Sequence, residues 1–201
     1  MTEYKRIERI FFSKDTTIVA KELLGNYLVR ETSKGKMIGK ITEVEAYLGP
    51  NDKASHSYNY KKTDRTKTMY MKPGTLYIYL IYGLYYCLNV ITEQEGIPCA
   101  VLIRKLFPID GIELMIENRN IRIGKNYKNL TDGPGKLCMA LDITKDKFNS
   151  KDSCSTDSKL YFAQVEGNNK KEIIVSKRIG IDYAEEDKDQ LLRFALKNKN
   201  S

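Results

Sequence analysis

The alternation of hydrophobic and polar residues is clearest over residues 26–48, which read NYLVRETSKGKMIGKITEVEAYL. Alternation in a stretch rich in β-branched and aromatic residues is typical of strands. Ser33, Lys34 and Gly35 interrupt the pattern at a point where a chain reversal fits. We therefore predict two paired strands, over residues 26–32 and 36–48.

Residues two apart in a strand share a face, so the second strand sorts its side chains into two sets. One face would carry Ile41, Glu43, Glu45 and Tyr47, and the other Ile38, Val44, Ala46 and Leu48. The first set places two carboxylates on an otherwise apolar and aromatic surface. A buried carboxylate without a partner is costly, so the pattern indicates either solvated glutamates paired with lysines or a functional site.

An uncharged stretch at residues 73–92, PGTLYIYLIYGLYYCLNVIT, is long enough to span a bilayer. Its Pro-Gly opening, its central Gly83 and its five tyrosines favour two packed strands that reverse at Tyr82 and Gly83. Residues 99–107, CAVLIRKLF, predict a further strand with Arg104 near its end.

Helical signals occur at three places. Residues 13–17 offer N-cap side chains before IVAKELL, and Gly25 is a natural stop. A second helix would open at residues 108–110, with an apolar face made of Ile112, Met115 and Ile116. Pro134 suits the first position of a third helix, whose apolar pair is Leu137 and Leu141.

The other segments are mostly polar. They comprise basic loops at 51–68 and 118–128, a polar surface loop at 145–158, short strands at 160–165 and 172–181, and a basic tail. No repeat or linker divides the chain. We therefore predict one α+β domain over residues 1–201, with a largely antiparallel sheet flanked by helices and a protruding tyrosine-rich hairpin.

The charge balance points to an anionic partner, since 34 lysines and arginines face 26 acidic residues and give a net charge of +8. The charged N-terminus, MTEYKRIERIFF, lacks the apolar core of a signal peptide, so we expect an intracellular protein without a membrane partner. One histidine and four dispersed cysteines argue against a metal site and against a disulfide framework.

Three residues are candidates for chemistry. Glu45, flanked by apolar and aromatic neighbours, could act as a general base. Arg104 is either an arginine that reaches solvent from a strand or a planar donor that pairs with Glu45. His56 follows eleven residues after Glu45 in a basic loop, where it serves either a structural hydrogen bond or catalysis.

Tyrosines cluster between residues 70 and 86, which hold six of the fourteen in the chain. They suit either a packed sheet core or a platform on which nucleic-acid bases stack. Tyr82 lies at the predicted reversal, and an exposed aromatic side chain there favours binding. The Gly-Pro-Gly-Lys run at residues 133–136 fits an ordinary helix start or a phosphate contact.

Together, several separated stretches resemble the alkyladenine (3-methyladenine) DNA glycosylase family, of the type named after the mammalian enzyme. They are EAYLGPNDKASHS, MYMKPGTLYIYLIYGLYYCLNV, CAVLIRKLFP, DGPGKLCMAL and RIGI, in the order of the family. The resemblance implies a monomeric, cofactor-free enzyme of base-excision repair. Such an enzyme flips a damaged purine from double-stranded DNA and hydrolyses its N-glycosidic bond with water as nucleophile.

The resemblance also implies residue roles. Glu45 is similar to the base that activates the water, and Arg104 to the arginine that helps hold it. Tyr82 matches the hairpin residue that fills the space left by the flipped nucleotide. The walls of the base pocket would be Tyr47, His56, Tyr79, Asn89 and Ile179. Among them, Asn89 matches the residue that crowds a guanine 2-amino group, and Ile179 matches an apolar residue that contacts the water network.

The basic residues beside the hairpin are expected to contact the DNA backbone, and they are Lys61, Lys62, Arg65, Lys67 and Lys72. The C-terminal ALKNKNS, the loop at 58–68 and the stretch near 150 depart from the mammalian form. The range of lesions that the protein would process therefore stays open. Its location is also open, and would be cytoplasmic in a bacterium or nuclear in a eukaryote. Two other classes remain, a non-catalytic nucleic-acid binder and a carbohydrate hydrolase with paired carboxylates.

Overall fold

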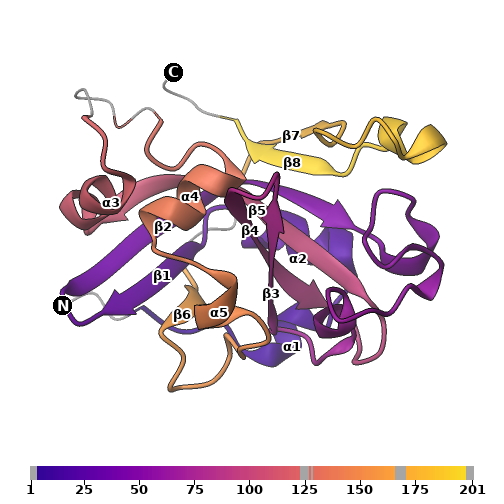
Figure 1. The fold of residues 1–201 in the computed structure, drawn as a ribbon, viewed down its shortest axis with the longest axis horizontal. Helices are drawn as coiled ribbons and strands as arrows, with labels where there is room; N and C mark the ends of the chain where they lie inside the picture. Colours follow the sequence, from indigo (N-terminus) through magenta and orange to yellow (C-terminus); the bar gives the residue numbers. More distant parts are fainter. Residues whose placement is uncertain (1–3, 123–126, 128, 166–170, 198–201) are drawn as a thin grey trace.

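The computed structural model describes residues 4–122, 127, 129–165 and 171–197. These residues form an eight-stranded, antiparallel sheet with helices packed on it (Figure 1), which confirms the predicted α+β class. The strand order is β3-β4-β5-β2-β1-β6, and β8 pairs with β2 and β7. Parts of the predicted basic segment and tail, residues 123–126, 128 and 198–201, lie outside the described residues.

The strands are β1 (Tyr27–Thr32), β2 (Gly35–Tyr47), β3 (Leu76–Ile81), β4 (Tyr85–Thr92), β5 (Cys99–Asp110), β6 (Leu160–Ala163), β7 (Ile173–Ser176) and β8 (Arg193–Leu196). The helices are α1 (Arg9–Phe12), α2 (Thr16–Leu23), α3 (Ile112–Arg119), α4 (Pro134–Ala140) and α5 (Lys145–Phe148). Short 3₁₀ turns lie at η1 (Gly49–Asn51), η2 (Tyr58–Tyr60), η3 (Lys67–Tyr70) and η4 (Glu185–Asp189).

Strand β2 carries an irregularity that sorts its side chains. Its register against β5 shifts on both sides of Glu43, as a β-bulge produces. The extra residue places Ile41 in the main core with Val44 and Ala46. The prediction that Ile41 shares a face with Glu43 and Glu45 is therefore wrong, because the alternation restarts at the bulge.

Helix α2 begins where the sequence predicts. The Asp15 side chain accepts hydrogen bonds from the backbone N–H groups of Thr17, at 2.8 Å, and Ile18, at 3.1 Å. The helix buries Val19, Ala20 and Leu23 in the main core. Helix α4 follows the same logic, since Pro134 opens it and both Leu137 and Leu141 are buried in that core.

The uncharged stretch at residues 73–92 forms β3 and β4, as expected, and they join in a tight hairpin. Tyr82 and Gly83 both have positive φ, 53° and 68°. Glycine adopts this conformation freely, whereas tyrosine does so at a cost of about 1–3 kcal/mol. Within the described residues, no helix is both long and apolar enough to span a membrane.

Two predicted boundaries are wrong in the middle of the chain. Residues 108–110 belong to β5, and α3 begins only after Gly111, whose φ is 67°. Pro108 fits in the strand because it lies opposite Gly39, beside a register shift. The polar stretch at 145–158 is more than a surface loop, since Phe148 at the end of α5 is buried.

The C-terminal region also differs from the prediction. Strand β7 covers only Ile173–Ser176, so the Arg178–Ile181 segment lies in a loop beyond it. Strand β8, Arg193–Leu196, forms where only a basic tail was expected. It pairs with β2 and so adds Arg193 beside the glutamates of that strand. Four residues with little hydrophobic periodicity gave no strand signal, so tertiary pairing decides the structure here.

Candidate active site

A row of side chains crosses β3, β4, β5 and β2 on one face of the sheet. The register pairs Tyr77 with Asn89, Asn89 with Leu102, and Leu102 with Glu45. On the far side of β2, Arg193 lies opposite Glu45. Directly paired residues of antiparallel strands point to the same face. The register of the sheet therefore brings residues distant in the sequence to one surface.

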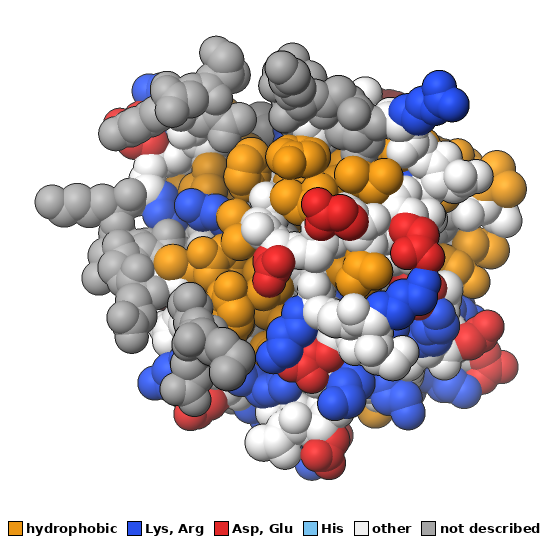
Figure 2. Space-filling model, turned by 90° about the vertical axis from the view of Figure 1, so that its left-hand side faces the viewer, with side chains coloured by type: hydrophobic (Ala, Val, Ile, Leu, Met, Phe, Trp, Pro, Cys, Tyr) orange, Lys and Arg blue, Asp and Glu red, His pale blue; other side chains and the backbone are white. Residues whose placement is uncertain are grey.

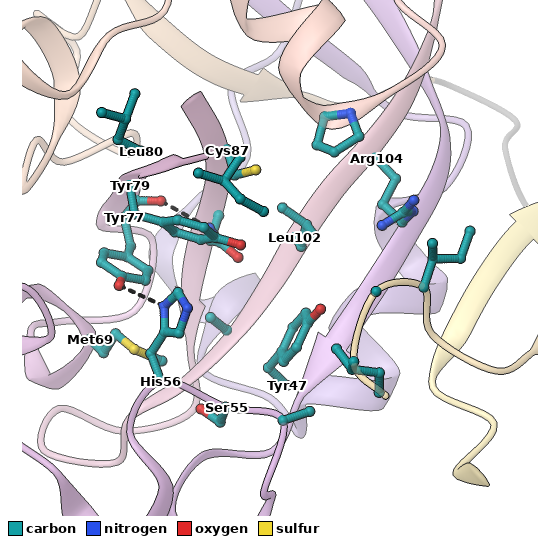
Figure 3. Close-up of a pocket in the computed structure, with 18 of the residues that line it drawn as sticks. Tyr47, Ser55, His56, Met69, Tyr77, Tyr79, Leu80, Cys87, Leu102 and Arg104 are labelled. Carbon is teal, nitrogen blue, oxygen red and sulfur yellow. Dashed lines mark hydrogen bonds between the residues drawn. The ribbon is translucent and has the colours of Figure 1, made fainter. Parts of the chain in front are cut away.

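This surface forms the floor of a cavity of about 490 Å³. Figure 3 shows His56 and Tyr79 on one side of the cavity, with Tyr47 and Arg104 on the other. The loop after β7 contributes Ile179 to the lining. A cavity lined by several aromatic rings and a few polar groups has the character of a small-molecule or base-binding site.

Glu45 lies directly behind the lining of this cavity, in contact with the lining residues Tyr47, Arg104 and Ile179, and is fully buried, with 0% of its surface exposed. Its Oε1 accepts a hydrogen bond from the backbone N–H of Ile179 at 2.8 Å and lies 3.2 Å from Nη1 of Arg104. The hydroxyl of Tyr47 donates to Oε2 at 2.9 Å. A carboxylate oxygen can accept two hydrogen bonds, and no described residue supplies Oε2 with a second. One acceptor position of Oε2 is therefore without a donor among the described residues.

Burial raises the pKa of Glu45 above its ordinary value, although Arg104, Ile179 and Tyr47 each oppose the rise. The opposing contacts keep the carboxylate form within reach, while desolvation increases its affinity for a proton. A carboxylate with a raised pKa is a stronger base at neutral pH. Among the described residues, Glu45 is thus suited to proton abstraction.

Arg104 contacts Glu45 as expected, but a second carboxylate also holds it. Its Nε donates to Oε1 of Glu43 at 3.0 Å. Arg193 donates to the same Glu43 oxygen at 2.8 Å. Burial lowers the pKa of Arg104, but Glu45 and Glu43 outweigh burial and raise it overall. Arg193 was not a candidate in the sequence analysis, because β8 itself was not predicted.

His56 is neutral at pH 7, because burial, with help from Arg65 and Lys61, lowers its pKa to about 4. Its Nε2 lies 3.3 Å from Nη2 of Arg65, and its Nδ1 lies 3.0 Å from the hydroxyl of Tyr77. A guanidinium can only donate, so Nε2 accepts and Nδ1 carries the proton. His56 therefore donates to Tyr77, a pocket residue that sequence reasoning did not assign.

The other predicted wall residues also line the cavity. The ring of Tyr79 lies 4.5 Å from the ring of His56, at 77° to it. Asn89 is buried on the neighbouring strand and donates to the backbone carbonyl of Tyr77 at 3.2 Å. The side chain of Ile179 is exposed at the cavity while its N–H points to Glu45. The structure thus gathers all the predicted pocket residues.

Tyr82 lies at the tip of the β3–β4 hairpin and lines the outer part of the cavity. Its side chain is 82% exposed, so the alternative that it packs in the core is wrong. Leu80 and Leu84 beside it are exposed as well. Exposed apolar side chains that cluster at one place on a protein surface indicate contact with a partner.

The basic residues expected at the DNA backbone all lie between β2 and β3 and are exposed, namely Lys61, Lys62, Arg65, Lys67 and Lys72. Lys67 forms a salt bridge with Asp64 at 3.1 Å, and the ammonium of Lys62 lies 5.0 Å from the ring of Tyr70. Arg65 differs from the others, because it contacts His56 and lines the cavity.

The opposite end of the molecule carries a mixed charge. Figure 2 shows basic and acidic side chains interleaved on the side that bears the β1–β2 turn and α3. Lys34 pairs there with Glu117 at 2.5 Å, and Lys36 and Lys159 pair with Glu31 at 2.9 and 3.5 Å. Each of these lysines has a carboxylate partner, so this end carries mixed charge and not a continuous basic surface.

No metal site is evident in the part of the chain that the structure describes. It contains no group of three or more histidine, cysteine, aspartate or glutamate side chains that could hold an ion. The helix start at residues 133–136 is also occupied by packing. A Cβ at Gly135 would lie 2.9 Å from Tyr85, and Lys136 forms a salt bridge with Asp132 at 2.9 Å.

The chain is similar to known proteins of one family along almost its whole length. The family model described as methylpurine-DNA glycosylase (MPG) matches residues 10–200. Proteins from Clostridium novyi, Clostridium tetani and Desulfitobacterium hafniense are 49%, 50% and 48% identical, and each alignment covers 96% of both chains. All three bear the provisional name 3-methyladenine DNA glycosylase. The chain therefore belongs to the methylpurine-DNA glycosylase family, whose members hydrolyse N-glycosyl bonds in DNA.

Proposed function

We propose that this DNA glycosylase flips alkylated purines of the 3-methyladenine kind out of double-stranded DNA and hydrolyses their N-glycosidic bond with a water that Glu45 activates. The observation that carries the proposal is the state of Glu45. It is fully buried beneath an aromatic cavity, has a raised pKa and keeps one acceptor position on Oε2. A general base requires these properties, and a purely structural carboxylate does not.

The walls of the cavity suit an alkylated base. The rings of Tyr47 and Tyr79 offer flat, electron-rich faces to a purine that carries positive charge. His56 is neutral because its pKa is lowered to about 4, so it adds no charge that would repel such a base. Glu45 would also stabilise the positive charge that develops on the sugar as the bond breaks.

The surroundings of the cavity suit duplex DNA. Flipping a nucleotide costs a few kcal/mol of lost stacking, and an exposed ring that fills the gap recovers part of it. Tyr82 on the hairpin has the required exposure, and Lys61, Lys62 and Lys72 lie in the segment that leads to it. All of these groups come from one chain, which suits a monomer. The relatives are bacterial, so we place the reaction in the bacterial cytoplasm, on chromosomal DNA.

The direct test is incubation with methylated duplex DNA, followed by assay of free bases and abasic sites. We expect the wild type to release alkylated purines. Glu45→Gln should bind the same duplex and release base at least about a hundredfold more slowly, because only the water-activating carboxylate is removed. Glu172→Gln is the matched control, because Glu172 forms an exposed salt bridge with Lys197.

Two results would overturn the proposal. Near-normal single-turnover release by Glu45→Gln would remove Glu45 from the mechanism. Tight binding of methylated DNA by the wild type, with no base released, would favour a non-catalytic nucleic-acid binder.

A further inference from the structure

Arg178 and Asp52 form an ion pair that is fully shielded from solvent, with 0% and 1% of their side chains exposed. Both terminal nitrogens of the guanidinium donate to the carboxylate, Nη1 to Oδ2 at 2.5 Å and Nη2 to Oδ1 at 2.8 Å. Planar, bidentate pairing of this kind fixes orientation as well as distance. Arg178 therefore cannot rotate without losing two charge-assisted hydrogen bonds.

The same two side chains join three separate segments of the backbone. Arg178 also donates to the carbonyl of Ala46 at 3.1 Å, at the end of β2, and to the carbonyl of Asp187 at 3.3 Å, in η4. Asp52 in turn accepts from the backbone N–H of Leu48 at 3.0 Å. The pair thus fixes the loop after β7 against the end of β2.

Both ends of this arrangement lead to Glu45. Ile179, the residue after Arg178, donates its N–H to Oε1 of Glu45 at 2.8 Å. The guanidinium of Arg178 also lies 4.8 Å from the ring centroid of Tyr47, whose hydroxyl donates to Oε2 of Glu45 at 2.9 Å. Apart from Arg104, these are the donors to Glu45 among the described residues.

We propose that Asp52 and Arg178 are positioning residues, whose buried ion pair holds the Ile179 amide and the Tyr47 hydroxyl on the carboxylate of Glu45. The inference rests on the proposed function, because it assigns the pair an effect on the base that activates water. Neither residue reaches the cavity, since neither belongs to its lining. They act on Glu45 through the two donors, and Arg178 also acts through its charge.

Donors to a carboxylate lower its pKa, so the pair opposes the desolvation of Glu45. If the pair is broken, the two donors drift and the pKa of Glu45 rises further. Base release needs ionised Glu45, so it increases with pH through that pKa, and its rising limb should move to higher pH. The other charged or titratable groups near Glu45 keep their places, and they are Arg104, Glu43, Arg193, Cys87 and Tyr183.

The test uses two variants. Arg178→Lys keeps the positive charge but loses the planar pair of donor nitrogens, and Asp52→Asn keeps the shape of the side chain but loses its negative charge. Single-turnover base release from methylated duplex DNA is followed against pH. We expect the rising limb of each variant to shift upward by at least about one pH unit, which lowers the rate on the limb about tenfold. In the Glu45→Gln background, Arg178→Lys should change affinity for the methylated duplex less than twofold.

Arg30→Lys is the matched control. Arg30 is also a buried arginine that pairs with an aspartate, Asp142 at 3.6 Å, and lies 4.7 Å from an aromatic ring, that of Phe148. Neither Arg30 nor Asp142 contacts Glu45 or its donors among the described residues, and neither lines the cavity. Arg30→Lys should therefore lower the melting temperature without moving the pH limb.

Coupling gives a second readout. Tyr47→Phe removes one of the two donors, so it should shift the limb in the wild type and shift it less in Arg178→Lys, where that donor is already displaced. Assays run below the melting temperature of each variant, and Asp52→Asn probes the pair from its other side if Arg178→Lys is unstable.

The outcomes separate the two proposals. If the wild type releases no base, the proposed function fails. If the wild type is active but both variants keep its pH limb, or if Arg30→Lys shifts the limb equally, the positioning role is overturned and the proposed function stands.

Discussion

Arg104 and Glu43 lie side by side on the cavity face of the sheet, with Nε of Arg104 donating to Oε1 of Glu43 at 3.0 Å. The guanidinium is thus held between two carboxylates, since its Nη1 lies 3.2 Å from Glu45. Arg193 donates to the same oxygen of Glu43 at 2.8 Å and balances its charge. Glu43, whose role the sequence left open, therefore supports the arginine that contacts Glu45.

Glu43→Gln should slow base release about tenfold and leave affinity for methylated duplex DNA within twofold. The amide loses the charge that holds Arg104, and a hydrogen bond to a charged group is worth about 1.5–3 kcal/mol. Single-turnover kinetics beside a binding titration measures both quantities. An equal loss in the exposed-pair control, Glu172→Gln, would contradict the support of Arg104 by Glu43.

Tyr82→Ala should weaken binding to lesion-containing DNA by roughly 5- to 150-fold, because stacking of one base on an aromatic ring is worth about 1–3 kcal/mol. Binding to undamaged DNA should change far less, since phosphate contacts need no plug. The melting temperature should hold, because the side chain is 82% exposed.

Tyr60→Ala is the matched control for Tyr82, because Tyr60 is also exposed and has a φ of 55°. Loss of affinity for both DNAs alike in Tyr82→Ala, or a similar preference for undamaged DNA in Tyr60→Ala, would argue against a plug at the hairpin tip.

The salt dependence of DNA binding should show how many phosphates the lysines between β2 and β3 neutralise. Log affinity should fall linearly with log salt, by about 0.9 for each phosphate neutralised. Lys72→Ala should reduce that slope by about one contact, whereas Lys34→Ala, at the opposite end and paired with Glu117, should leave it unchanged. An affinity that does not respond to salt would point to a ligand other than DNA.

Water as the nucleophile predicts that no covalent intermediate forms between the protein and the DNA. A lysine nucleophile would pass through a Schiff base, which borohydride reduces to a stable adduct. We therefore expect intact abasic sites and no trapped complex when cleavage proceeds in borohydride. Gel electrophoresis detects an adduct directly, and a trapped band that needs a cleavable lesion would exclude the water mechanism.

His56 should make the free energy of unfolding depend on pH. Its folded pKa of about 4 lies below the ordinary value of 6.5, so the unfolded chain binds more protons between these limits. Stability from the neutral ring is therefore complete above pH 6.5 and is lost as the pH falls toward 4, by up to about 3 kcal/mol. Denaturant titrations of wild type and His56→Gln should differ in slope over this window, and parallel curves would show that His56 is not held neutral.

Local chemistry predicts the elements whose signals are local. Asp15 begins a helix because its side chain caps free N–H groups, and Tyr82 with Gly83 marks a reversal because glycine accepts positive φ. The contact of Arg104 with Glu45 followed from complementary charge on neighbouring apolar strands. These features need only residues close in sequence or a strong pairing preference.

The remaining features depend on contacts between distant parts of the chain. The pair of Asp52 and Arg178 spans 126 residues, and each reads as an ordinary polar residue of a loop. Arg193 reaches Glu43 only because β8 joins the sheet. The roles of His56, Asn89 and Ile179 rested on the family resemblance, since their spacing alone does not show that they share a cavity.

The bulge in β2 makes chain length, and not only residue identity, a requirement of the site. In a regular strand, the gain or loss of one residue turns every later side chain to the opposite face. Ile41 and Val44 are three residues apart and both enter the hydrophobic core, which regular alternation does not allow, so the bulge absorbs one residue just before Glu45. Deletion of Thr42 should therefore restore regular alternation and leave Glu45 on the cavity face, whereas one residue inserted between Val44 and Glu45 should turn Glu45 into the core, although no residue of the site had been replaced.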